Sequence, residues 1–148
     1  MITANATQED DGQGIPGLID NNTSTFYHSF WGKDAPDGKP HRLQIHLNKP
    51  SAGEFYFDYM GRGNGDGGGD VKRAEVFGSH SGADADGAWT SLGIITYKLP
   101  EGRGKQGVPQ NHIKSAESYE YLRFVPLARR NKDPLGLTGT SSDWFNMS

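Results

Sequence analysis

The chain has 148 residues, 21 glycines, 8 prolines, no cysteine and a formal net charge of −3. This length suits a single domain with its own core, and the glycine and proline content favours short strands and turns over long helices. The absence of cysteine excludes a disulfide scaffold and a thiolate zinc site. Lysines and arginines are dispersed along the sequence instead of clustered, so we expect no nucleic-acid partner.

The first segment with a distinctive composition is 17–29, GLIDNNTSTFYHS. Asp20, Asn22 and Thr25 bring short oxygen-bearing side chains into a turn between apolar residues. Such a turn suits a hard cation such as Ca²⁺, which binds several oxygen atoms including backbone carbonyls. The same residues also fit a turn in which Asp and Asn side chains bond to their own backbone, without any metal. This segment on its own leaves both interpretations open.

Alternating apolar residues predict short strands along the rest of the chain. Leu43, Ile45 and Leu47 alternate with polar residues, as in a strand that is buried on one face. The strands predicted in this way are 42–47, 55–59, 71–79, 89–96 and 121–125. Turn-forming residues separate them at 34–38, 61–70, 81–87, 100–107 and 128–143. No long amphipathic helix is predicted, and the pattern indicates an antiparallel β-sandwich.

Further motifs occur in a fixed order at 40–47 (PHRLQIHL), 59–62 (YMGR), 76–79 (VFGS), 86–89 (DGAW) and 121–124 (YLRF). Together with 17–29, and at these intervals, they resemble the coagulation factor V/VIII type C (discoidin-like) domain, in the variety of the bacterial carbohydrate-binding module family 32. No single motif is specific, whereas the ordered set is. The resemblance covers nearly the whole chain. It implies one all-β domain over 1–148, an antiparallel β-sandwich of the discoidin or galactose-binding-domain-like jelly-roll type.

The resemblance also implies a sugar site in the loops at one end of the sandwich. A sugar presents vicinal hydroxyls and an apolar face, which suit planar multi-donor side chains beside an aromatic ring. The residues that match the family's sugar-binding positions are Arg62, Asn64, Trp31, His28 and Trp144.

Each of these residues also has a purely structural interpretation. Arg62 suits a salt-bridged strand end, and His28 suits a buried core histidine. Phe145, the neighbour of Trp144, fits the core better than the site. Trp31, in a polar loop, is the least easily explained as core.

The glycine-rich segment 61–70, GRGNGDGGGD, formally contains a dinucleotide-binding fingerprint. That motif must join a strand to a helix, and no helix is predicted after it. We interpret the segment as a flexible loop whose glycines let a ligand approach Arg62 and Asn64 closely.

The calcium positions of the family match Asp20, Asn22 and Thr25, with backbone carbonyls completing the shell. The family's further calcium ligand, a glutamate on a final strand, has no counterpart before Ser148. A loop without that glutamate would bind a structural Ca²⁺ weakly, since affinity follows the charge and number of the ligands.

Motifs for catalysis are missing from the sequence, which has neither a zinc-ligand spacing nor a nucleophile elbow. A glycosidase pair formed by Asp58 with Glu54 or Asp70 is left open. A sandwich of this size offers a shallow site at its loops, so we expect no enzymatic activity.

These observations predict a non-catalytic carbohydrate-binding module that recognises a terminal galactose-type or N-acetylhexosamine sugar. The expected context is a covalently linked glycoside hydrolase, hexosaminidase- or chitobiase-like, in a larger exported protein at an extracellular, periplasmic or outer-membrane surface. The alternatives are an adhesion or scaffolding domain that binds protein or lipid through the same loops, and a structural spacer. Because these loops carry more Asp and Gly than Lys and Arg, a membrane partner is not expected.

Overall fold

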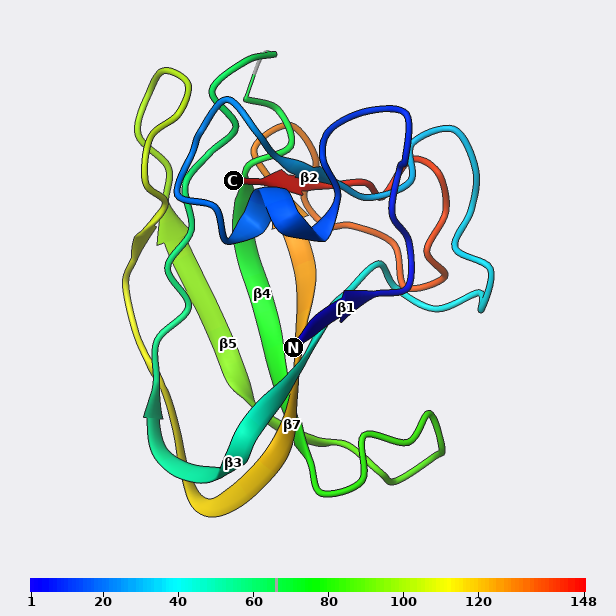
Figure 1. Cartoon of the computed structure of the whole chain (residues 1–148), viewed down its shortest axis with the longest axis vertical. Coiled ribbons are helices and arrows are strands. Elements are labelled where there is room, and N and C mark those ends of the chain that lie inside the picture. Colours follow the sequence, from blue (N-terminus) through cyan, green and yellow to red (C-terminus); the bar gives the residue numbers. More distant parts are fainter. Residues whose placement is uncertain (66) are drawn as a thin grey trace.

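The computed structural model describes residues 1–65 and 67–148; position 66, in the predicted loop 61–70, lies outside the described residues. The fold is all-β, and the described residues form a six-stranded antiparallel sheet and a second sheet of two strands (Figure 1). The large sheet has the order β1-β3-β7-β4-β5-β6. Its strands are β1 (Ile2–Ala4), β3 (Leu43–Phe55), β7 (Ile113–Arg129), β4 (Val71–Ser79), β5 (Thr90–Lys98) and β6 (Val108–Pro109). The small sheet pairs β2 (Tyr27–His28) with β8 (Asn146–Met147).

The one helical element among the described residues is the single 3-10 turn η1 (Ile15–Leu18). No helix in this part of the chain is long and apolar enough to cross a membrane. The expectation of an antiparallel β-sandwich with little helix is therefore confirmed.

The predicted strands differ from the observed ones mainly in length. β4 has the expected bounds, whereas β3 and β7 run well beyond the predicted 42–47 and 121–125. The prediction of a strand over 55–59 is wrong for 56–59, which forms no strand. Burial still alternates there: Tyr56 is exposed, Phe57 packs against the core, and Tyr59 is buried.

The core lies between the two sheets. Tyr27 and Phe145 come from the small-sheet side, with ring centroids 5.5 Å apart, and both are fully buried. They belong to one apolar cluster with Val71 and Val76 of β4 and Phe124 of β7. The expectation that Phe145 belongs to the core is confirmed.

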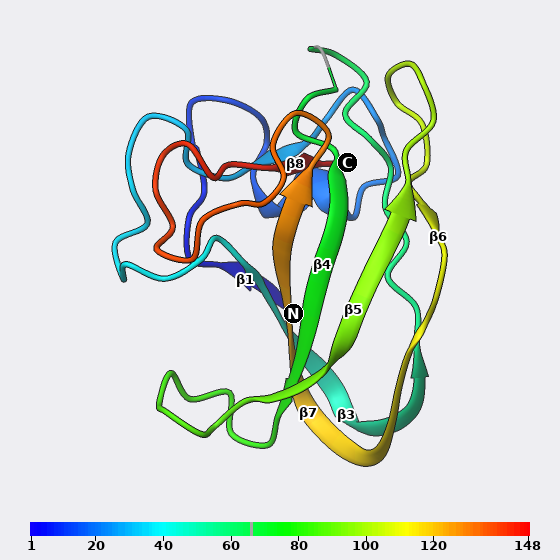
Figure 2. The same cartoon turned by 180° about the vertical axis from the view of Figure 1, so that it is seen from behind.

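The pairing of the strands brings several loops to one end of the molecule. The segments 8–14, 20–25 and 61–65 gather at the end where β2 and β8 lie, and the turn that connects β4 to β5 lies at the opposite end (Figures 1 and 2). The candidate site is built from these gathered loops.

Candidate functional site

Arg62 is held between an aromatic ring and a carboxylate. Its guanidinium lies 3.8 Å from the centroid of Phe26, and its Nη2 is 3.7 Å from Oδ1 of Asp11. Its Nε donates to Oδ1 of Asn64 at 2.5 Å. The Arg62 side chain is 18% exposed, so its remaining donors reach the surface in a fixed direction. The two loop residues predicted for the site are thus in direct contact.

His28 lies on the other side of the same carboxylate, with its Nε2 4.0 Å from Oδ2 of Asp11. The Nδ1 atom is 2.6 Å from the carbonyl oxygen of Ser29, which can only accept, so Nδ1 carries the proton. Nε2 of the neutral ring is then an acceptor. Burial lowers the pKa of His28; the Ser29 carbonyl and Asp11 oppose this, whereas Arg62 and Arg129 reinforce it. The neutral ring is therefore the dominant form near pH 7.

Trp144 packs between His28 and Arg129. Its ring centroid is 4.9 Å from that of His28, and the Arg129 guanidinium lies 3.9 Å from the indole. Arg129 is itself buried, at the end of β7. These contacts make the Trp144 ring a support for His28, and its role in sugar binding stays a prediction.

The Trp31 backbone lies close to that of His28, through Gln8. Its side chain is 49% exposed, in agreement with a position outside the core. Its backbone N–H lies 3.3 Å from Oε1 of Gln8, and the N–H of Gln8 donates to the carbonyl of His28 at 2.9 Å. Trp31 therefore carries an exposed indole, and its backbone is linked to that of His28 through Gln8.

Sequence reasoning missed Asp11, Phe26 and Arg129. Asp11 stands between His28 and Arg62, and only the folding of three separate segments brings it there. The available signal was the acidic run 9–11 in a loop that precedes the 3-10 turn. The cluster defined by Asp11, His28, Arg62 and Asn64 is called the rim cluster below.

The segment 61–70, interpreted from the sequence as a flexible loop, is packed against the domain in its second half. Residues 67–70 are buried, and Arg130 donates to the carbonyl of Gly67 at 3.1 Å while pairing with Asp70 at 3.1 Å. Gly63 serves the packing of two loops: its N–H donates to the carbonyl of Thr23 at 2.8 Å, and a Cβ there would lie 2.5 Å from that oxygen. At this position the missing side chain permits close contact between the two loops.

The three predicted calcium residues do meet in one turn. The Asp20 carboxylate accepts from the Thr25 hydroxyl at 2.6 Å and from the Asn22 N–H at 3.0 Å. Oδ1 of Asn22 accepts from the Ser24 N–H at 3.0 Å. The turn is thus closed by its own hydrogen bonds. Across 1–65 and 67–148 no group of three His, Cys, Asp or Glu residues could hold a metal, and the calcium ion stays a prediction.

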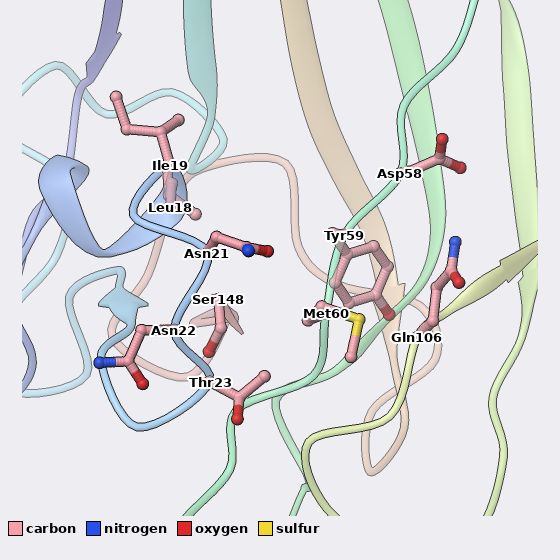
Figure 3. A pocket seen from close by; sticks show the side chains of 10 residues that line it. All are labelled: Leu18, Ile19, Asn21, Asn22, Thr23, Asp58, Tyr59, Met60, Gln106 and Ser148. Atoms are coloured by element: carbon pink, nitrogen blue, oxygen red, sulfur yellow. The ribbon is translucent and has the colours of Figure 1, made fainter.

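A cavity of about 470 Å³ lies outside the rim cluster, between 18–23 and 58–60 (Figure 3). Its walls are Leu18, Ile19, Asn21, Asn22, Thr23, Asp58, Tyr59, Met60, Gln106 and Ser148. Ser148 and Met60, which both line the cavity, are joined by two backbone hydrogen bonds of 2.9 and 3.1 Å. None of the five predicted sugar-site residues lines it.

The carboxylates considered for glycoside hydrolysis lie in three different surroundings. Asp58 lines the cavity of Figure 3, Asp70 is buried against Arg130, and Glu54 pairs with Lys114 at 3.1 Å. Glycosidases need two carboxyl groups that face each other across a cleft. Asp58, Asp70 and Glu54 thus form no such facing pair in the described part of the chain.

Comparison with known proteins identifies the architecture. No family model matches the chain. Solved structures resemble it over 99% of its length, among them a family 32 carbohydrate-binding module of Clostridium perfringens NanJ in complex with galactose, with a TM-score of 0.60, 13% identity and 88% of that chain covered. An F5/8 type C domain from Bacteroides fragilis gives a TM-score of 0.63 at 13% identity, with 85% of that chain covered. The fold is that of the F5/8 type C domain. This confirms the discoidin-like β-sandwich expected from the ordered motifs.

Two further relatives extend the comparison of the F5/8 type C fold. A family 32 module of Clostridium perfringens in complex with GalNAc-β-1,3-galactose has a TM-score of 0.63 and 15% identity over 99% of this chain and 89% of that one. A sialidase of Micromonospora viridifaciens is 28% identical over 131 residues, which are 87% of this chain. The chain spans only 18% of the sialidase's length.

Proposed function

We propose that the chain is a non-catalytic carbohydrate-binding module that recognises a terminal galactose-type or N-acetylhexosamine sugar at the rim cluster. The observation that carries the proposal is the convergence of Asp11, His28, Arg62 and Asn64 from separate segments at one end of the sandwich.

The rim cluster offers both partners that a hydroxyl group needs. Asp11 and Nε2 of His28 accept hydrogen bonds, while Arg62 and the Asn64 amide donate them. Adjacent hydroxyls of a pyranose can therefore donate to one pair and accept from the other. The exposed indole of Trp31 supplies apolar area beside these groups. A small ligand with few contacts is bound weakly.

Two comparisons support this proposal. Two structures with the same fold are complexes with galactose and with GalNAc-β-1,3-galactose. The relation to part of a sialidase supports an attached glycoside hydrolase, which the module would hold near its glycan by raising the effective concentration. An extracellular, periplasmic or outer-membrane surface is the compartment that suits such a partner.

Titration calorimetry with galactose and N-acetylgalactosamine tests the proposal. We expect weak binding by the wild type, and at least a tenfold loss for Arg62→Ala, since hydrogen bonds to a charged group contribute about 1.5–3 kcal/mol each. Arg73→Ala is the matched control, because Arg73 pairs with Asp133, away from the rim cluster. Galactose binding that Arg62→Ala leaves unchanged would remove the site. Binding to liposomes or to a protein, without any sugar binding, would favour the alternative adhesion function.

A further inference from the structure

A second polar cavity adjoins the rim cluster. It measures about 330 Å³ and is lined by Thr7, Gln8, Glu9, Asp10, Phe30 and Lys33. These residues come from the loop after β1 and the loop after β2, which lie side by side in both views (Figures 1 and 2). The volume falls within the range of about 300–1,000 Å³ typical of small-molecule sites.

The cavity and the rim cluster share one segment of chain. Asp10, in the cavity wall, directly precedes Asp11 of the cluster. The N–H of Gln8, also in the wall, donates to the carbonyl of His28 at 2.9 Å. A ligand that fills the rim cluster is therefore adjacent to the cavity, with residues 8–11 as their common border.

The side chains of the cavity are held in place before any ligand arrives. The Gln8 amide donates to the Asp10 carboxylate and accepts from the N–H of Trp31. The Lys33 ammonium lies 4.3 Å from the centroid of Phe30. Lys33 forms no ion pair in the part of the chain that the structure describes, so its donors face the cavity and solvent.

The chemistry of the wall selects the class of ligand. Two carboxylates and an amide oxygen accept hydrogen bonds, and a hydroxyl, an amide nitrogen and an ammonium donate them. This mixture suits a neutral, hydroxyl-rich ligand. An anionic sugar would meet two carboxylates and one cation, which is an unfavourable balance.

We propose that this cavity is a second subsite, which binds the next neutral sugar of a glycan whose terminal residue lies in the rim cluster. The inference rests on the function proposed above. It assigns Lys33, Gln8 and Glu9 to the second sugar.

Calorimetry with mono- and disaccharides tests the subsite. The probes are galactose, N-acetylgalactosamine, lactose, galactosyl-β-1,3-N-acetylglucosamine and GalNAc-β-1,3-galactose. We expect at least one neutral disaccharide to bind fivefold or more tightly than either monosaccharide. Lys33→Ala and Glu9→Gln should abolish that advantage and leave the monosaccharide affinity unchanged. Lys114→Ala, at an exposed pair with Glu54, is the matched control.

Chemical shifts provide a second readout that does not depend on these variants. The backbone amides of 7–10 and of Lys33 should shift with the tighter disaccharide and not with galactose alone. Equal affinities for all mono- and disaccharides, or a disaccharide advantage that survives Lys33→Ala, overturn the subsite while the proposed function stands. A wild type that binds none of the sugars overturns the proposed function, and the subsite with it.

Discussion

The guanidinium of Arg129 lies 3.9 Å from the indole of Trp144. The same indole contacts the ring of His28, and Arg129 also donates to the carbonyl of Gly68 at 3.3 Å. The end of β7 is thus linked through one aromatic ring to β2. His28 takes its orientation from this stack, which distinguishes the supporting Trp144 from the exposed Trp31.

Trp31 and Trp144, two of the three tryptophans, should respond differently to sugar. Because Trp31 is exposed beside the rim cluster and the Trp144 ring is engaged, we expect galactose to change the emission of Trp31 alone. Trp31→Phe should abolish the fluorescence change, and Trp144→Phe should keep it. A change that depends on Trp144 instead would assign the stacking face to that residue.

Removal of the Trp144 ring should affect stability more than removal of Trp31. Trp144→Ala leaves a gap between His28 and Arg129, and we expect it to lower the free energy of unfolding by about 2 kcal/mol. Trp31→Ala should change it by less than about 0.5 kcal/mol, as is usual for an exposed side chain. Urea denaturation measures both, and equal losses would contradict the assignment.

Sugar affinity should fall in mild acid through His28. Burial lowers its pKa below the ordinary value of 6.5, so the neutral ring is the form that the folded protein favours. The stability gained is complete above 6.5 and is lost as the pH falls through the lowered pKa. Protonation also turns the Nε2 acceptor into a donor that pairs with Asp11. We expect galactose affinity to be constant above the ordinary value and to decrease below the lowered one.

Calorimetry as a function of pH checks this dependence. His80→Ala is the matched control, because His80 is exposed, follows the end of β4 and pairs with Glu117, away from the rim cluster. The control should keep the wild-type pH profile. A profile that stays flat through the histidine range would show that Nε2 of His28 accepts nothing from the sugar.

Gly63→Ala should weaken sugar binding indirectly, although residue 63 itself need not touch the sugar. Its Cβ would lie 2.5 Å from the carbonyl oxygen of Thr23, so the two loops must separate and Arg62 moves with them. We expect a severalfold loss of galactose affinity and a lower melting temperature. Gly32→Ala is the control, since a Cβ there meets nothing within 4 Å and its backbone conformation is ordinary. Equal behaviour of the two variants would contradict this account of Gly63.

Calcium should stabilise the turn around Asp20 only modestly. The turn closes through its own hydrogen bonds, and Asp20→Ala should cost about 1 kcal/mol in EGTA. With a single carboxylate, the ion should bind at about millimolar concentration, so 10 mM Ca²⁺ adds about 1 kcal/mol. Thermal unfolding with Ca²⁺ or EGTA measures this, with Mg²⁺ as the control. Stabilisation that persists in Asp20→Ala would place the ion elsewhere.

Much of the fold could be predicted from local pattern, because alternation of apolar residues reports burial directly. β4 has its predicted bounds, and Phe145 lies in the core as expected. Pairing is a different property, which depends on a neighbouring strand. For this reason 56–59 alternates in burial without forming a strand, and β7 extends through exposed polar residues that pair with β3.

The candidate site likewise has a part that local sequence predicts and a part that depends on contacts between distant segments. The residue types of the site could be read from the chain alone, because His28 and Arg62 stand in motifs whose order is specific and Asn64 closely follows the second. The position of Asp11 between His28 and Arg62, the contact of Arg129 with Trp144 and the packing of Gly63 on Thr23 became visible only in the folded molecule. The physical reason is that these contacts join segments distant in sequence, whose distances are set by the packing of two sheets and not by any local preference.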